Sequence, residues 1–490
     1  MTVRRLLLLL IAALVGSIAG LVVGPRPVPL GPPTGDPALA AVAASVLART
    51  GNDGTVSVLQ VRDGASAWAG FGDVTPDSRF EIGSLTKTFS GLLLADAATR
   101  GEVRLDDPLS AHVPELAGTD AGSATLRELA QHTSGLPSMG SLDMARIMAE
   151  DLAGVPYTVY REATPESVLA DTASASTGSR GTWAYSNLGL AALGHALARA
   201  AGSPDWGTLA TERLFTPLGM TSTLVATPGN PAPDLLQPHN PNGTPTGPQT
   251  GTGYAPAGIG VTSTTADLAR FAEALLAGTA PGMAAVEPSF DITTGTLTGQ
   301  RMGLAWVVSP ADGHEVVWHN GMTGGMASML AVDRERQAAT IVLTDRARDV
   351  TGAGLVLLAE GEDPGLPAVP HVDADTVGWV AAGALLVVLF AWAALRARSR
   401  ARLLGQGLAA AGSLAVWCLA RPWDWAPPWS LGLALGLFAG AVLVTALRWR
   451  ELRWLPDRAR PVAVVVGTLG AAWFGAMVAF AGWVLVLARG

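Results

Sequence analysis

Uncharged stretches long enough to cross a lipid bilayer lie at both ends of this chain. The first, Leu6–Val23, has eighteen residues and follows Arg4 and Arg5. Four more close the chain, at about Thr376–Leu395, Leu403–Ala420, Trp429–Leu447 and Val462–Ala488. A helix of roughly 18 or more apolar residues spans the hydrocarbon core of a membrane. The sequence therefore predicts an amino-terminal membrane segment over residues 1–24 and four transmembrane helices over residues 376–490.

The amino-terminal stretch is either a secretory signal or an uncleaved membrane anchor. Ser17-Ile18-Ala19 is a weak small-x-small cleavage site, which favours the anchor. In both cases Arg4 and Arg5 keep the amino end in the cytoplasm, so the residues that follow cross the membrane.

Arginine is concentrated in two of the loops between the carboxyl-terminal stretches. Residues 396–402 contain four arginines and residues 448–460 contain five, whereas the intervening loop has only Arg421 beside Asp424. Positively charged loops stay in the cytoplasm. We therefore expect a multi-pass protein of the cell membrane, with residues 25–372 and the carboxyl end outside the cytoplasm.

The four carboxyl-terminal stretches contain no Asp, Glu, Lys, Arg or His, and Gln406 is their strongest polar group. Ion and proton pathways normally need ionisable groups at membrane depth. Gly432, Gly436 and Gly440 recur every four residues, a spacing that lets another helix approach closely. These features favour a packed anchor bundle over a transporter, and they leave a protein partner of the helices unknown.

The region between the membrane segments is acidic and long enough to form one large core. Residues 25–372 contain 19 Lys and Arg against 35 Asp and Glu, a net charge of −16. Nucleic-acid binding depends on a basic surface, so no nucleic-acid partner is expected. The single cysteine, Cys418, excludes an intrachain disulfide.

Prolines and glycines mark the borders of this middle region. Residues 25–37 and 361–375 are predicted to be linkers, which leaves a domain over residues 38–360. The predicted strands lie near both ends of that domain, at Thr55–Val61, Ser66–Phe71, Gly303–Ser309, Glu315–His319, Met326–Val332 and Thr340–Thr344. Helix patterns lie between them, so we predict an α+β fold with one antiparallel sheet, flanking helices and a helical portion.

Lysine is almost absent, because 31 of the 32 basic residues are arginine and only Lys87 is not. Arginine replaces lysine on a solvated surface, but it fails where an amine must lose its proton. Ser84 lies three residues earlier, so on a helix the two side chains share one face. A desolvated lysine there can take the serine proton and make Ser84 a nucleophile. The alternative is an ordinary surface lysine.

Two further motifs contain side chains that suit such a centre. Tyr185 and Asn187 open a predicted helix, where a phenol can act as base and acid and an amide can bind substrate. His319-Asn320-Gly321-Met322 ends a predicted strand next to glycines, which leaves backbone N–H groups free for a substrate or an oxyanion. Each motif also has a structural interpretation, as a core tyrosine before a capped helix and as a satisfied histidine.

The ordered set Ser84-x-x-Lys87, Tyr185-x-Asn187 and His319-x-Gly321 resembles the penicillin-recognising serine hydrolases. This family comprises class C β-lactamases, D-Ala-D-Ala carboxypeptidases and related esterases. The segment Leu129–Pro137 also looks like the family, whereas the membrane stretches do not. The resemblance covers about residues 38–360.

The resemblance implies a β-lactamase/transpeptidase-like fold and an acyl-enzyme mechanism. The sequence has no metal-ligand spacing and no phosphate-binding loop, so no metal or other cofactor is expected. Ser84 would attack a carbonyl carbon, while Lys87 and Tyr185 would handle the proton. The backbone N–H groups of Ser84 and Met322 would hold the oxyanion.

The resemblance also assigns substrate binding to Asn187 and to the strand residues His319, Asn320 and Gly321, and it leaves His132 structural. Many family members carry Lys-Thr-Gly at this strand, whose ammonium and hydroxyl hold a substrate carboxylate. Histidine is only partly charged at neutral pH. A D-Ala-D-Ala-type peptide, an ester and a β-lactam all remain candidate substrates.

A different class of function is a catalytically idle, penicillin-binding-like sensor that signals through the membrane helices. Such a sensor would not need Lys87 in a chain that otherwise uses arginine alone. The retained lysine therefore favours a serine hydrolase tethered to the outer face of the membrane.

Overall fold

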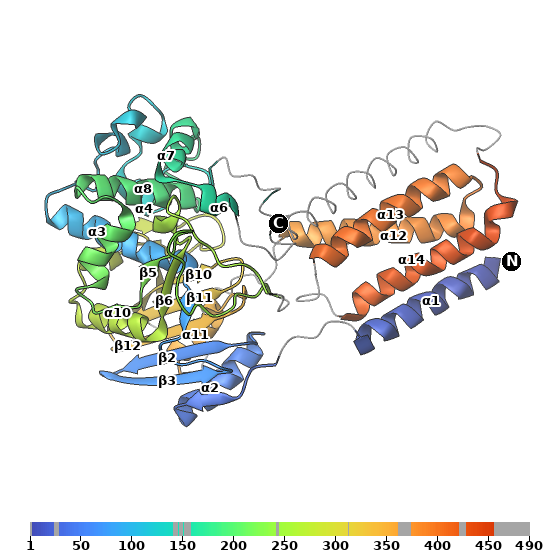
Figure 1. Ribbon diagram of the computed structural model, residues 1–490, viewed down its shortest axis with the longest axis horizontal. Helices are drawn as coiled ribbons and strands as arrows, with labels where there is room; N and C mark the ends of the chain where they lie inside the picture. The colour runs from blue at the N-terminus through green and yellow to red at the C-terminus, as the bar shows by residue number, and fades with distance from the viewer. Residues whose placement is uncertain are drawn as a thin grey trace. The chain divides into compact units, whose positions relative to one another are not determined.

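The computed structural model describes residues 2–23, 29–140, 146, 150, 158–241, 245–311, 313–360, 374–420 and 428–454. These residues belong to two compact units (Figure 1). One unit contains long helices from both ends of the chain, and the other contains the sheet and helices of the middle domain.

The middle domain is built on a sheet of nine strands, and the sheet is antiparallel, as the sequence predicts. The strand order is β1-β3-β2-β12-β11-β10-β9-β8-β7, so strands from the two ends of the domain meet in one sheet. The strands are β1 (Pro33–Gly35), β2 (Val56–Arg62), β3 (Ala65–Phe71), β7 (Phe290–Asp291), β8 (Arg301–Met302), β9 (Val307–Ala311), β10 (His314–Met322), β11 (Ala327–Asp333) and β12 (Ala338–Thr344). The predicted α+β class is confirmed.

Helices cover both faces of this sheet. α2 (Pro37–Arg49) and α11 (Thr351–Leu358) pack on one face, where Val58 is buried. α10 (Thr265–Ala277) packs on the other face, where Leu59 is buried. Successive residues of a strand point to opposite faces. Two hydrophobic clusters therefore share the central strands and hold both helix layers to the sheet.

The helical portion lies between the two groups of strands in the sequence. Its helices are α3 (Lys87–Thr99), α4 (Leu126–Ala130), α6 (Thr158–Glu162), α7 (Pro165–Ser174), α8 (Asn187–Ala200) and α9 (Trp206–Ala210). The same portion of the chain contributes β4 (Arg79–Glu81), β5 (Leu224–Val225) and β6 (Val261–Thr264) to a second sheet. The prediction of a single sheet is wrong on this point, because strands of two to four residues are too short to show an alternating pattern.

The predicted linker over residues 25–37 is partly structured. Pro33–Gly35 pairs with β3 as an edge strand, a position where proline is tolerated because no inner ladder bond is lost. α2 then begins at Pro37, and the Asp36 side chain accepts a hydrogen bond from Leu39 N at 2.8 Å. Proline in the first turn and aspartate at the cap are typical of a helix start.

The second unit contains α1 (Thr2–Val23), α12 (Ala374–Arg396), α13 (Arg400–Ala420) and α14 (Pro428–Arg448). Two described segments, Val3–Val22 and Trp429–Glu451, are long and apolar enough to cross a membrane. Three of the four predicted carboxyl-terminal spans are thus helices, whereas the fourth, Val462–Ala488, lies outside the described residues. A bundle of four membrane helices stays a prediction.

Within this unit α1 and α14 pack against each other in antiparallel directions. A Cβ atom added at Gly16 would overlap the carbonyl of Gly432, and one at Gly436 would overlap the carbonyl of Ala12. The Arg5 guanidinium lies 2.8 Å from the Glu451 carboxylate just beyond the carboxyl end of α14. The glycine spacing noted in the sequence therefore serves close packing between these two helices.

Candidate active site

Ser84 and Lys87 lie where a short 3₁₀ turn, Gly83–Thr86, leads into α3. The Lys87 Nζ atom is 2.6 Å from Ser84 Oγ and donates a hydrogen bond to the Ala257 carbonyl, also at 2.6 Å. The face shared by the two side chains is the arrangement that the sequence predicts. Ser84 is partly exposed, whereas Lys87 has no exposed surface.

Burial decides the charge of the lysine. Because a buried ammonium loses its hydration, the pKa of Lys87 lies well below its ordinary value. A neutral amine has a lone pair that can accept the Ser84 O–H. The pair can therefore generate a nucleophilic serine without a histidine.

Tyr185 is the second group on the serine. Its hydroxyl donates to Ser84 Oγ at 2.7 Å, and Lys87 Nζ lies 5.0 Å from the centre of its ring. Burial raises the pKa of Tyr185 far above the usual range, although the hydrogen bond with Ser84 partly opposes this rise. Tyr185 therefore keeps its proton, which makes Lys87 the better base and Tyr185 a donor.

His132, which the sequence leaves structural, lies directly against Tyr185. The two rings are 4.5 Å apart at an interplanar angle of 32°, and His132 Nδ1 accepts a hydrogen bond from Ser186 N at 3.0 Å. Burial, with the nearby Lys87 and His319, lowers the pKa of His132 well below its ordinary value. His132 is thus a neutral side chain that supports the tyrosine ring. Its backbone is left-handed (φ 59°), a conformation that is strained for a residue other than glycine.

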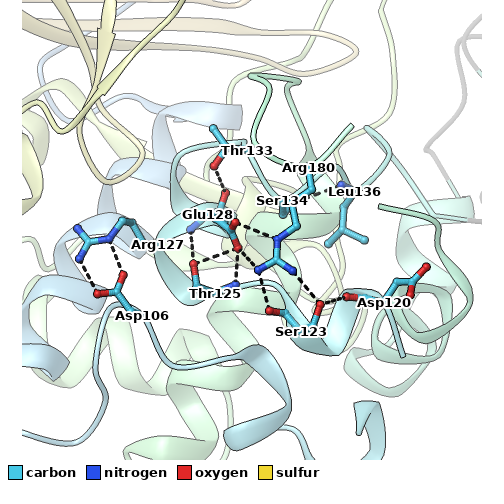
Figure 2. A network of polar contacts seen from close by, with 10 residues as sticks. All are labelled: Asp106, Asp120, Ser123, Thr125, Arg127, Glu128, Thr133, Ser134, Leu136 and Arg180. Atoms are coloured by element: carbon cyan, nitrogen blue, oxygen red, sulfur yellow. Dashed lines mark hydrogen bonds and ion pairs between the residues drawn. The ribbon is translucent and has the colours of Figure 1, made fainter. Parts of the chain in front are cut away.

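A charged network holds the segment that precedes Tyr185 (Figure 2). Arg180 donates to both carboxylate oxygens of Glu128, at 2.9 and 2.7 Å, and to Ser123. Glu128 also closes the capping box with Thr125 at the start of α4. Backbone bonds from Gly181 N to Thr133 O and from Ala184 N to His132 O continue the attachment at 2.7 and 2.8 Å. The loop after α4 and the Tyr185 segment are therefore one rigid support.

The end of β10 passes directly beside the serine turn. A Cβ atom at Gly321 would overlap the Ile82 carbonyl, and one at Gly83 would lie 2.8 Å from Met322 N. On the other side Gly258 has φ 116°, and a Cβ there would overlap the Gly83 carbonyl. Only glycine allows both chains to approach Ser84 this closely.

His319 is buried rather than presented to a ligand. Only 3% of its surface is exposed, and its Nδ1 donates to the Asn320 carbonyl at 2.5 Å. Burial, then the nearby Lys87, lowers the pKa of His319 to about 3. The partial positive charge expected from the sequence is therefore absent at neutral pH, because the imidazole is shielded from water.

A cavity of about 190 Å³ opens beside Ser84. Of the predicted binding residues, Asn187 and Met322 line it, whereas among the described residues His319, Asn320 and Gly321 lie outside its lining. The remaining side chains of its wall include Met139, Tyr160, Gln249, Tyr254, Ile259 and Thr323. None of these six has a motif that marks it in the sequence. Within the described ranges no cluster of three or more His, Cys, Asp or Glu could hold a metal ion.

The sequence model of the family described as Beta-lactamase matches residues 45–359. This chain therefore belongs to the β-lactamase family, a family of serine hydrolases. The class C β-lactamase of Rhodobacter sphaeroides aligns with it at a TM-score of 0.54 and 22% identity, over 66% of this chain and 98% of that one. At this identity the likeness shows the β-lactamase-like α+β fold.

Two curated relatives are similar over shorter ranges. "Beta-lactamase-like protein 2" of Dictyostelium discoideum is 30% identical over 155 residues, which cover 31% of this chain and 27% of the relative. The D-alanyl-D-alanine-carboxypeptidase/endopeptidase AmpH of Escherichia coli (strain K12) is 33% identical over 199 residues, which cover 38% of this chain and 48% of the relative. This chain thus spans less than half the length of either relative.

Proposed function

We propose that this protein is a serine hydrolase that acts through an acyl-enzyme formed on Ser84. The observation that carries the proposal is the double contact of Ser84 Oγ, with Lys87 Nζ at 2.6 Å and with the Tyr185 hydroxyl at 2.7 Å. Two proton-handling groups on one hydroxyl give serine the base and the acid that acyl transfer needs.

In the first step Ser84 Oγ attacks the substrate carbonyl carbon, and the Ser84 proton passes to the lone pair of Lys87 Nζ. The negative charge that develops on the carbonyl oxygen is held by the backbone N–H groups of Ser84 and Met322. This role is supported by the close approach of β10 to the serine turn. As the bond to the leaving group breaks, Tyr185 gives its hydroxyl proton to the leaving group and receives the proton held by Lys87 in its place.

In the second step water enters where the leaving group was and attacks the acyl carbon. Lys87 takes a proton from the water and returns it to Ser84 Oγ as the ester bond breaks, and the protonated Tyr185 hydroxyl donates a hydrogen bond to that oxygen. Asn187, on the wall of the cavity, orients the substrate. Its amide donates to Met139 Sδ at 3.3 Å, so its position is already fixed.

The proposed substrates are peptide, ester or β-lactam carbonyl compounds. The name of AmpH assigns that relative to D-alanyl-D-alanine peptides. Strand residues His319, Asn320 and Gly321 would position substrate through their backbone, because His319 is buried and neutral.

We also propose that residues 38–360 form the catalytic domain, outside the cytoplasm, and that residues 1–24 and 376–490 anchor it in the cell membrane. The antiparallel packing of α1 on α14 supports this topology, since it places Arg5 and Glu451 at the same end. The arginine-rich loop after α14 is predicted to lie in the cytoplasm with the amino end.

Hydrolysis of a p-nitrophenyl ester by the full-length protein in detergent tests the proposal. Ser84→Ala should lower kcat/KM by at least about 10⁴-fold, as expected for loss of a nucleophile. Ser174→Ala, which removes an exposed hydroxyl at the end of α7, is the control and should leave the rate unchanged. A folded Ser84→Ala protein with full activity would refute the assignment, and an inactive wild type would favour the sensor.

A further inference from the structure

We infer that the cavity beside Ser84 accepts a short, uncharged acyl group, so that the substrate is a neutral carboxylic ester rather than a carboxylate-bearing peptide or β-lactam. The inference rests on the proposed function and names the substrate class of that same site.

The lining of the cavity is uncharged. Its apolar side chains include Met139, Ile259 and Met322, and its polar ones are the neutral groups of Asn187, Gln249, Thr323 and two tyrosines. Within the described part of the chain, no Lys, Arg, His, Asp or Glu lines it. Such a wall solvates an alkyl chain well and a carboxylate poorly.

Lys87 and His319, two neighbouring side chains that could carry a positive charge, are not available to a substrate carboxylate. Lys87 is fully buried, and its Nζ is already engaged with Ser84 and with the Ala257 carbonyl. His319 is 97% buried and its Nδ1 is used by the Asn320 carbonyl. A carboxylate that entered would therefore lose its hydration without gaining a counter-ion, which is costly.

The domain around the cavity carries negative rather than positive net charge. Residues 25–372 as a whole have a net charge of −16. The field of the domain therefore opposes an anionic ligand.

The dimensions and walls of the cavity favour a short acyl group. Its volume of about 190 Å³ is below the range of roughly 300–1,000 Å³ that drug-sized ligands occupy. The Tyr160 and Tyr254 rings meet edge-on at 6.2 Å, and the Tyr254 hydroxyl accepts a hydrogen bond from Gly140 N at 3.0 Å. These contacts hold in place two of the side chains that line the cavity.

A matched pair of substrates tests the inference: the p-nitrophenyl esters of 4-methylpentanoic acid and, as the monoester, of succinic acid. Their acyl groups have the same number of heavy atoms and differ in a neutral isopropyl against a carboxylate. We expect wild-type kcat/KM to be about 100-fold higher for the neutral ester, because the carboxylate is desolvated without a partner. In a neutral series, the rate should fall from butanoate to octanoate.

Met322, whose side chain is 57% exposed at the end of β10, provides the matched variants. Met322→Lys adds a cation at the rim and should shift the ratio of the two rates towards the succinyl ester by about tenfold, the scale of a partly solvated charge pair. Met322→Leu keeps the wall apolar and should leave the ratio unchanged. The ratio is used because effects common to both esters cancel in it.

A wild-type protein that hydrolyses the succinyl ester as fast as the neutral one would overturn the inference while leaving the acyl-enzyme intact. A Met322→Lys variant with an unshifted ratio would do the same. If the wild type hydrolyses neither ester, the proposed function fails and the inference fails with it.

Discussion

Two regions contact the Tyr185 segment, and each contains one basic side chain. The pKa of this side chain is lowered in one region and raised in the other. Over the Tyr185 ring lies Lys87, which is fully buried, and this burial lowers the pKa of the lysine. At the backbone that precedes Tyr185 lies Arg180, whose pKa is raised by its hydrogen bonds to Glu128. Burial alone would raise the pKa of Glu128, but the bonds from Arg180 and Thr125 outweigh it and leave the pKa lowered.

The difference teaches what each cation can do. Arg180 is paired, partly exposed and permanently charged, so it fastens the loop after α4 to the Tyr185 segment. Lys87 is kept from solvent, so it spends time as a neutral amine that can take a proton. The single lysine of this chain fits these two roles, because arginine can form ion pairs that hold segments together but cannot act as a base.

The largest expected effect on activity comes from replacing the buried Lys87 with arginine, the basic residue found in the other region. Lys87→Arg keeps a positive charge but removes the proton acceptor, so ester hydrolysis should fall by about 10²–10⁴-fold, roughly 3–5 kcal/mol of barrier. Arginine is larger than the buried site, so melting curves must accompany the kinetics. Lys87→Met, similar in volume and uncharged, is the control for packing and should lose activity equally while staying folded.

An active, folded Lys87→Arg protein would contradict this account. Lys87 would then contribute only its positive charge, and Tyr185 would become the principal candidate base.

A second prediction concerns the buried acid Glu81 and the dependence of protein stability on pH. Burial raises the pKa of Glu81 to about 7, with bonds from Thr323 and Gln249 partly opposing the rise. The folded state therefore holds a proton that the unfolded state releases above its ordinary pKa of 4.5. This contribution to stability is full below pH 4.5 and is lost as the pH rises through about 7, up to about 3 kcal/mol in all.

Glu81→Gln, which mimics the protonated acid, should flatten the fall in stability between pH 5 and 8. The matched variant is Glu128→Gln, where the sign is reversed, because the lowered pKa of Glu128 supplies stability that is lost as the pH falls. Chemical denaturation at several pH values measures both. A Glu81→Gln protein with the wild-type pH dependence would show that Glu81 is not the titrating group.

The smallest effect on stability and activity is expected from a substitution of Arg180. Arg180→Ala should cost about 1 kcal/mol of stability, the scale of a partly exposed ion pair, and should lower kcat a few-fold by loosening Tyr185. Arg180→Lys should restore part of both. If Arg180→Ala left both kcat and its pH profile untouched, the network would not position the tyrosine.

The long strands and the grouping of Ser84, Lys87 and Tyr185 are the parts that the sequence predicts well. The hairpin of β2 and β3 has a regular turn at Asp63-Gly64, and Ser84, Lys87 and Tyr185 belong to short motifs whose order is informative. The structure brings both Lys87 and Tyr185 within hydrogen-bond distance of Ser84, although 101 residues separate Tyr185 from Ser84.

Other features depend on distant contacts and leave no local sign. Glu81 meets Gln249 across 168 residues of sequence, and the neutrality of His319 follows from burial by neighbours that no motif identifies. β1 was hidden in a proline-rich segment because its pairing with β3 depends on the edge of the sheet rather than on its own residues. Burial and long-range pairing are properties of the packed chain, so a reading of spacing alone misses them.

The intact mass of the full-length protein after treatment with a fluorophosphonate tests the central claim most directly. We predict a single adduct, mapped to Ser84 by peptide analysis, with labelling abolished in Ser84→Ala and strongly slowed in Lys87→Met. An adduct on another serine, or undiminished labelling of a folded Ser84→Ala protein, would contradict the assignment of Ser84 as the nucleophile.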